Sequence, residues 1–178
     1  MLYARMPRDR VGVLIGPEGG TKQRLEERTG TQLQVDSETG EVVIDELRAI
    51  DPVMPLKAKD IVQAIGRGFS EERAFRLLDD EVYLEVLDIK DFARSTARVE
   101  QIRGRLIGTR GKTRRIIEEL TSVDVSIMGH TVSLIGPSFE LAIAREAVVM
   151  LLRGSEHSTV YRFLERKRAD IKAWQMGL

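Results

Sequence analysis

The chain has 178 residues, enough for one large domain or for two small ones with modest cores. With 42% hydrophobic and 31% charged residues it is ordinary for a soluble globular protein, and no apolar run is long enough to span a membrane. The absence of cysteine excludes disulfides and thiolate metal sites. No signal-peptide pattern is visible at the N-terminus, so we expect a cytoplasmic protein.

The charges cancel overall but are unevenly distributed. There are 28 basic and 28 acidic residues in all. Between Arg94 and Arg115 eight basic residues stand against one acid, and residues 2–24 hold five basic residues against two acids. The compensating acids lie in 36–51 and 79–81. A basic face on a neutral protein is still typical of nucleic-acid binding.

Taken in chain order, the first part of the sequence predicts a small α+β domain. Residues 31–35 alternate between polar and apolar side chains, as a half-buried strand does. Gly30 suits the end of a helix, and Asp51 and Ser70 suit the N-terminal caps of two later helices. The predicted elements are a strand at 2–6, helices at 7–15 and 21–29, strands at 31–35 and 42–44, a helix after Asp51 with Ala58, Ile61, Val62 and Ile65 on its core side, and a short helix at 70–78.

The rest of the chain predicts a similar order of elements. Residues 90–103 form a longer connection with helix-like apolar spacing that continues to Leu106. The acidic run 79–81 is the expected junction, which gives domains at 1–80 and 81–178, the second with a C-terminal helical extension. The other predicted elements are a strand at 82–89, a helix at 113–120, strands at 123–127 and 131–135 joined by a turn at Gly129 and His130, a helix at 138–152, and a basic helix at 158–174.

Each half carries a Gly-x-x-Gly turn before a predicted helix, at residues 16–19 and 108–111. Glycine lets backbone N–H groups approach a ligand closely, because no Cβ stands in the way. The N-terminus of the following helix is a natural anion site. The sequence therefore predicts a phosphate-binding turn in each half.

The two halves are copies of one another. A shift of 92 positions places residues 12–29 on residues 104–121, and nine of the eighteen pairs are identical. Further along the chain the shift falls to 86, because the second copy has shorter loops. A repeat that holds its register across several elements indicates a duplicated domain.

The order strand, helix, Gly-x-x-Gly, helix, strand, strand, helix resembles the KH domain of the eukaryotic type, type I. The resemblance implies an α+β fold with two tandem domains, each a three-stranded antiparallel sheet against helices. KH domains clamp about four nucleotides of single-stranded nucleic acid against the Gly-x-x-Gly loop. Aromatic residues make up only 5% of the chain, which fits an aliphatic KH groove better than an aromatic stacking platform.

On this interpretation the second loop is the main RNA site. Its backbone amides would hold phosphates, nearby cations would add salt-sensitive affinity, and an aliphatic groove of Leu106, Ile107 and Val125 or Ile127 would take the bases. The candidate RNA-binding residues are Arg105, Ile107, Gly108, Thr109, Arg110, Gly111, Lys112, Arg114, Arg115 and Ile127 in the second copy, and Gly16, Pro17, Glu18, Gly19 and Lys22 in the first.

Over residues 3–170 the chain resembles the partner-of-Nob type of small-subunit ribosome assembly factor in its short archaeal form. The segments that carry the resemblance are 66–70, 77–80, 111–118, 144–147 and 160–164. The resemblance implies binding near the 3′ end of small-subunit rRNA during its maturation. The partners it implies are a 3′-end processing endonuclease, an rRNA dimethyltransferase or a translation initiation factor. Pro17 and Glu18 depart from the basic pair that this family leads us to expect.

Other classes of function have weaker support. Gly111-Lys112-Thr113 mimics the end of a P-loop, but the required first glycine would stand at Leu106. The sequence shows no catalytic set of nucleophile, histidine and acid, and no cluster of metal ligands. We therefore expect no enzyme activity, no metal site and no cofactor. We also expect no catalytic role for His130 or His157. Two alternatives remain: a KH-type regulator of mRNA or translation, and a protein-interaction scaffold that uses the acidic segment 36–51.

Overall fold

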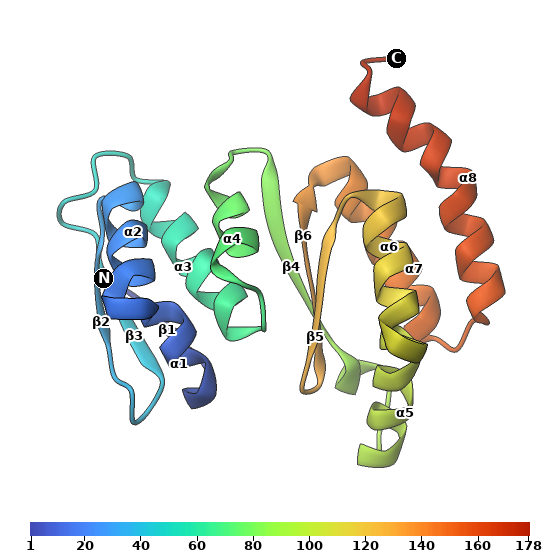
Figure 1. Cartoon of the computed structure of the whole chain (residues 1–178), viewed down its shortest axis with the longest axis horizontal. Helices are drawn as coiled ribbons and strands as arrows, with labels where there is room; N and C mark the ends of the chain where they lie inside the picture. The colour runs from blue at the N-terminus through green and yellow to red at the C-terminus, as the bar shows by residue number, and fades with distance from the viewer. The chain divides into compact units, whose positions relative to one another are not determined.

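The computed structural model describes residues 1–178 and divides them into two compact units, Met1–Asp80 and Glu81–Leu178 (Figure 1). Each unit contains a three-stranded antiparallel sheet and a set of helices. The predicted α+β class is therefore confirmed. No helix combines the length and apolar character needed to cross a membrane.

The first unit places its helices on a sheet with the order β1-β3-β2. Tyr3 of β1 pairs with Val43 of β3, and Leu33 of β2 pairs with Ile44. Helix α3 (Met54–Gly66) packs on β1 and β3. The elements are β1 (Leu2–Arg5), α1 (Arg8–Ile15), the 3-10 turn η1 (Pro17–Gly19), α2 (Gly20–Thr29), β2 (Gln32–Val35), β3 (Glu41–Asp45), α3 (Met54–Gly66), α4 (Glu71–Ala74) and the 3-10 turn η2 (Phe75–Leu78).

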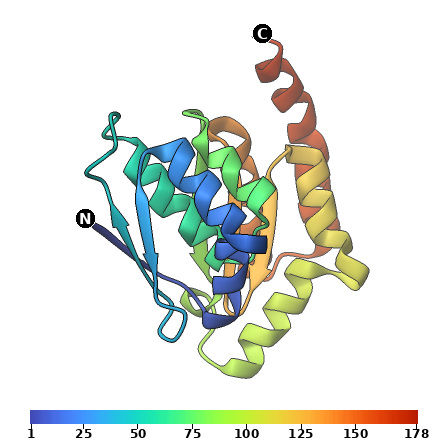
Figure 2. The ribbon, with the colours of Figure 1, turned by 60° about the vertical axis from the view of Figure 1, so that its left-hand side comes forward.

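The second unit repeats this plan with the sheet order β4-β6-β5. Its final helix runs beside α6 and α7, as both ribbon views show (Figures 1 and 2). The elements are β4 (Val82–Asp88), the 3-10 turn η3 (Ile89–Asp91), α5 (Thr96–Ile107), the 3-10 turn η4 (Thr109–Gly111), α6 (Lys112–Thr121), β5 (Asp124–Met128), β6 (Thr131–Pro137), α7 (Ser138–Leu152) and α8 (His157–Gln175).

Each unit has its own apolar core between sheet and helices. In the first unit the predicted core stripe of α3 is confirmed, since all four of its residues are fully buried. In the second unit β6 is buried along most of its length, which suits the central strand of a sheet covered by helices. Burying one such aliphatic side chain contributes roughly 1.5–3 kcal/mol. The largest buried side chains include Leu14, Leu25, Ile44, Ile61 and Ile65 in the first unit, and Ile102, Leu106, Ile117, Leu134 and Ile135 in the second.

One predicted helix start is wrong. Helix α3 begins at Met54 with Pro55 in its first turn, and Val53 precedes it without a side-chain cap. The Asp51 carboxylate accepts a hydrogen bond from the Val53 N–H at 2.9 Å, which closes a local turn before the helix. The cap predicted at Ser70 is confirmed, because its hydroxyl accepts from the Arg73 N–H.

Candidate nucleic-acid interface

The two Gly-x-x-Gly turns have almost the same backbone conformation. The first glycine has φ 73° and ψ 175° at Gly16, and φ 75° and ψ 169° at Gly108. The second has φ 74° at both Gly19 and Gly111. These positive φ angles favour glycine, and α2 and α6 begin directly after the turns. Each unit therefore presents backbone amides and a helix N-terminus at one place.

A side chain five residues later explains why each turn must begin with glycine. A Cβ at Gly16 would overlap the hydroxyl of Thr21, and one at Gly108 would overlap the hydroxyl of Thr113. Both threonines are buried in the first turn of the next helix. Threonine packing thus fixes the position of the turn against the helix that follows it.

The third residue of each turn lies in the left-handed region although it is not glycine. Glu18 has φ 55° and Arg110 has φ 57°. Pro17 and Thr109 precede them, and all four residues are exposed at the tip of the turn. The following glycine is left-handed as well, and its N–H donates to the carbonyl of the first glycine, at 3.2 Å in the first turn and 3.1 Å in the second, which closes a tight turn with an exposed tip.

The cations of the second turn are largely free to meet a ligand. Arg110, Lys112 and Arg115 are exposed, and no carboxylate lies within ion-pair distance of them. The Lys112 ammonium lies 6.0 Å from the centre of the Tyr161 ring, and Arg115 donates a hydrogen bond to the Arg110 carbonyl at 3.4 Å. Arg114 differs, because it pairs with Glu118 at 3.2 Å.

The cations of the first turn are occupied within the fold. Lys22 pairs with Glu26 at 2.9 Å. Arg24 makes two hydrogen bonds to Glu71, of 2.5 and 2.8 Å, and Thr21 donates another to the same carboxylate. The Arg24 hydrogen bonds are the main cause that lowers the pKa of Glu71. Glu71 therefore neutralises Arg24, and Glu26 neutralises Lys22, so neither side chain is free to meet a phosphate.

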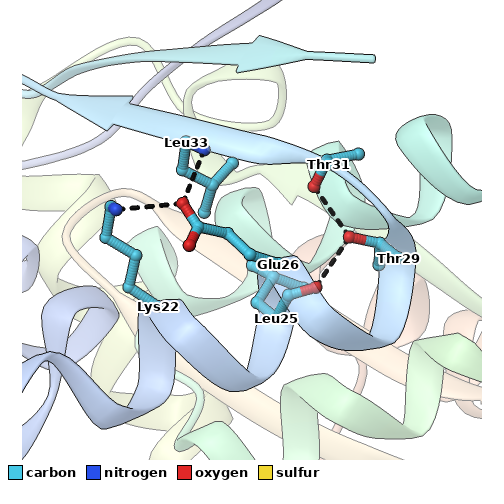
Figure 3. A network of polar contacts seen from close by, with 6 residues as sticks. All are labelled: Lys22, Leu25, Glu26, Thr29, Thr31 and Leu33. Carbon is cyan, nitrogen blue, oxygen red and sulfur yellow. Dashed lines mark hydrogen bonds and ion pairs between the residues drawn. The ribbon is translucent and has the colours of Figure 1, made fainter. Parts of the chain in front are cut away.

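The position of Lys22 is fixed by a network between α2 and β2 (Figure 3). The Glu26 carboxylate accepts from the Lys22 ammonium and from the Leu33 N–H, at 2.9 and 2.8 Å. Thr29, at the end of the same helix, bonds to the Leu25 carbonyl and to the Thr31 hydroxyl. A phosphate at the first turn would have to compete with Glu26 for Lys22.

Arg105 has a structural role that the sequence did not indicate. Its guanidinium donates to the carbonyls of Leu151, near the end of α7, and of Ser155, just after that helix, and the side chain is half-buried. In the first unit Arg10 bonds to the carbonyls of Ile65 and Phe69 in the same way, at 2.8 and 2.9 Å. The two pairs of carbonyls are equivalent in the repeat, because the shift of 86 positions relates one pair to the other. These hydrogen bonds hold Arg105 against its own fold, and its contact with RNA stays a prediction.

The predicted aliphatic groove is partly wrong. Leu106 and Val125 are each only 1% exposed and belong to the core. Ile107 and Ile127 are half-buried, so both remain available to a ligand. Val125 and Ile127 lie on the same side of β5, but Val125 is buried and Ile127, nearer the hairpin tip, is half-buried.

Gly104 is a further candidate that is not among the predicted site residues. It lies one helical turn before Gly108 on the same face of α5, and a Cβ added to it would meet nothing within 4 Å. Gly12 has the same position and surroundings in α1. A glycine inside a helix costs about 1 kcal/mol relative to alanine, so two uncrowded ones in matching places are a signal for close approach of a ligand.

Comparison with known proteins agrees with this geometry. Residues 83–169 match the family described as "Eukaryotic type KH-domain (KH-domain type I)", and residues 4–50 match the KH domain family. The chain is 46% identical over 168 residues to the KH domain-containing protein MJ0443 of Methanocaldococcus jannaschii. That alignment covers 94% of this chain and 74% of the relative.

Solved structures share the whole fold. A chain of the a/eIF2alpha–aDim2p–rRNA complex from Pyrococcus horikoshii OT3 is 48% identical with a TM-score of 0.88, covering 95% of this chain and 94% of that one. Dim2p from the same organism is 50% identical with a TM-score of 0.85, covering 93% and 98%. A protein of unknown function from Aeropyrum pernix is 39% identical with a TM-score of 0.90, covering 98% and 94%.

The fold of two tandem type I KH domains, predicted from the repeated glycine turns, is therefore confirmed. KH domains are RNA-binding modules that clamp single-stranded nucleic acid at this loop. By fold, sequence identity and length of alignment, the chain belongs to the archaeal tandem KH-domain family of the Dim2p, or partner-of-Nob, type.

Proposed function

We propose that this protein binds single-stranded rRNA of the small ribosomal subunit and acts in the assembly of that subunit. The observation that carries the proposal is the second glycine turn, where Arg110, Lys112 and Arg115 stand without acidic partners beside the N-terminus of α6. A chain 48% identical to this one was crystallised in a complex whose components are a/eIF2alpha, aDim2p and rRNA.

In the proposed mode of binding, the backbone amides of Thr109 and Arg110 and the start of α6 hold phosphates, while the N–H groups of Gly108 and Gly111 donate to the carbonyls of Gly104 and Gly108 within the fold. Arg110 adds a guanidinium that can pair with a phosphate in bidentate fashion. The half-buried Ile107 and Ile127 form opposite walls for the bases. β5 is an edge strand of its sheet, so its free backbone groups can pair with base edges.

The finer part of the proposal concerns where the RNA lies. We infer binding near the 3′ end of small-subunit rRNA, during 3′-end maturation, because the whole chain resembles Dim2p in sequence and structure. A translation initiation factor is the partner favoured by the complex of that relative. A processing endonuclease and an rRNA dimethyltransferase are further candidates. The first unit would extend or orient the strand gripped by the second.

A role in protein contact beside RNA binding is supported by the loop between β3 and α3. Leu47 is 87% exposed and Ile50 is 100% exposed, although large aliphatic side chains are usually covered. Both residues lie within the acidic segment 36–51 that suggested a scaffold. Such a contact is compatible with RNA binding, because the loop lies in the first unit and the cationic turn in the second.

Crosslinking and sequencing of RNA bound in cells tests this proposal. We expect one dominant site, near the 3′ end of small-subunit rRNA. The matched control is the variant Thr109→Asp/Arg110→Asp, which should lose that site while the protein remains folded. Crosslinks spread over many mRNAs would support the alternative of an mRNA regulator. No crosslinks above those of the variant would contradict RNA binding.

The proposal excludes catalytic turnover. Lys112 stands after a turn that lacks the first glycine of a P-loop, and its ammonium lies above an aromatic ring. Purified protein should therefore hydrolyse neither ATP nor RNA. Turnover that follows the protein through purification and disappears in Lys112→Ala would contradict this expectation.

A further inference from the structure

The second unit contains a segment that the first unit lacks. In the first unit only two residues separate β1, which ends at Arg5, from α1, which begins at Arg8. In the second unit β4 ends at Asp88 and α5 begins at Thr96. Helix α5 also has 12 residues, against 8 in α1. The extra segment, residues 89–100, is anchored in the core by Ile89, Ala93 and Val99.

This segment and the tip of the β5–β6 hairpin enclose a pocket of about 630 Å³. Such a volume lies within the range of small-molecule sites. Ala93 and Val99 give the pocket an apolar floor, while charged and hydroxyl side chains surround it. Its lining residues are Lys90, Ala93, Arg94, Ser95, Thr96, Val99, Glu100, Gly129 and His130.

The pocket lies at the start of α5, the helix that ends at the second glycine turn. Thr96, Glu100, Gly104 and Gly108 follow one another at intervals of four residues, so they share one face of α5 and its end. On the other side of the groove, Ile127 is followed after two residues by the hairpin tip at Gly129. A strand lying along the groove from the turn would therefore reach the pocket.

The charges of the pocket suit a phosphate. The side chains of Lys90 and Arg94 are exposed and take part in no hydrogen bond or ion pair. His130 Nδ1 lies 2.9 Å from the Asp88 carboxylate, which holds the ring at the rim. The single acid of the lining, Glu100, lies 3.7 Å from the guanidinium of Arg103. Two exposed cations thus lie at the pocket without a hydrogen-bonded acid, although the Asp88 carboxylate that holds His130 also attracts Lys90.

We propose that this pocket binds one further nucleotide of the same RNA strand, with its base on Ala93 and Val99 and its phosphate between Lys90 and Arg94. This inference rests on the proposed function. A KH loop grips about four nucleotides. The extra segment would lengthen that footprint in the second unit only, on the unit whose turn carries the free cations. The apolar floor and cationic rim match the two chemical parts of a nucleotide.

The test compares a short and a long RNA. The short probe is a single-stranded RNA of about four nucleotides that the second turn binds, and the long probe extends it by about four nucleotides at either end. The variant is Lys90→Ala/Arg94→Ala. The matched control is Arg98→Ala, an exposed arginine in the first turn of α5 that bonds to Gln101 and does not line the pocket. Binding is followed by fluorescence anisotropy at several salt concentrations.

We expect the long RNA to bind the wild type at least about tenfold more tightly than the short one, and the double variant to lose that gain. Its log–log salt slope should fall by roughly 0.7 for each phosphate that it no longer binds. Affinity for the short RNA should stay within about twofold, and Arg98→Ala should behave as the wild type. Equal affinity of the wild type for both RNAs, or equal losses in the variant, would overturn this inference alone. Retention of short-RNA binding by Thr109→Asp/Arg110→Asp would instead contradict the proposed function.

Discussion

Glu18 and Arg110 occupy the same position in the two glycine turns, with φ and ψ of 55° and 28° in one and 57° and 29° in the other, yet they carry opposite charges. The backbone of the turn is therefore duplicated while its electrostatic character is not. A carboxylate at this tip repels a phosphate, whereas a guanidinium can pair with it. The shared backbone makes the two units internal controls for one another.

The first prediction is that the second turn supplies most of the RNA affinity. Thr109→Asp/Arg110→Asp should weaken binding of single-stranded RNA at least tenfold, about 1.4 kcal/mol. The salt slope should flatten by roughly 0.7 for each phosphate that the variant no longer binds. Pro17→Asp/Glu18→Asp should have a distinctly smaller effect, because one acid is already present there. The measurement is a titration at several salt concentrations.

The same pair of variants separates the contribution of side-chain charge to RNA affinity from that of the backbone amides. Asp is among the residues that tolerate a positive φ, so neither replacement should disturb the turn. Both variants should keep the free energy of unfolding within about 0.5 kcal/mol of the wild type. Equal losses of affinity in the two turns would show that backbone amides, rather than arginine, carry the interaction.

The second prediction separates two arginines that look alike in the sequence. Arg105→Ala removes hydrogen bonds from the carbonyls of Leu151 and Ser155, so urea unfolding should show a loss of about 1–3 kcal/mol. Arg110→Ala should leave stability unchanged, since its side chain is exposed, and should weaken RNA binding instead. If Arg105→Ala proves as stable as the wild type but binds RNA poorly, the structural role is wrong.

Periodic and local signals predicted the elements of this fold, because both depend on residues close in the chain. The alternation of residues 31–35 and the glycine at 30 placed a strand and a helix end correctly. The prediction of Asp51 as a helix cap was wrong because its carboxylate accepts a hydrogen bond from the Val53 N–H in a turn before the helix. A short carboxylate can accept hydrogen bonds from backbone N–H groups both in such turns and at helix N-termini.

The site was less predictable because it depends on contacts between distant residues. Arg105 reaches carbonyls 46 and 50 residues away, which no local pattern encodes. Leu106 and Ile107 are adjacent aliphatic residues; the spacing of Val99, Ile102 and Leu106 indicated a core side for Leu106, but the groove predicted from both residues ignored that periodicity. Gly104 carried a signal of its own, as an uncrowded glycine inside a helix.

The third prediction concerns stability at acid pH. Arg24 holds the pKa of Glu71 below its ordinary value of 4.5, so ionised Glu71 stabilises the fold above that pH. This contribution is lost as the pH falls through the lower pKa of the folded state. Because both side chains are partly exposed, Glu71→Gln should cost less than about 1 kcal/mol at neutral pH, and this difference should shrink in acid.

Thermal unfolding of Glu71→Gln and the wild type across the acid range provides the measurement. Glu72→Gln is the matched control, because Glu72 is exposed and next to Glu71 in α4. Its stability curve should follow that of the wild type at every pH. A difference between Glu71→Gln and the wild type that stays constant down to low pH would show that the ion pair with Arg24 contributes nothing.

The last prediction uses the helix glycines to separate stability from function. Alanine at Gly104 or Gly12 should stabilise the protein by about 0.5–1 kcal/mol, because each lies inside a helix and its Cβ would meet no other atom. Gly104→Ala should nevertheless weaken RNA binding, since the new methyl group would project into the groove one turn before Gly108. Gly12→Ala should bind RNA nearly as the wild type does, if the second unit supplies most of the affinity. Melting temperature and RNA affinity measured on the same samples decide the matter. A Gly104→Ala variant that is more stable and binds RNA unchanged would remove α5 from the interface and leave the loop alone as the binding element.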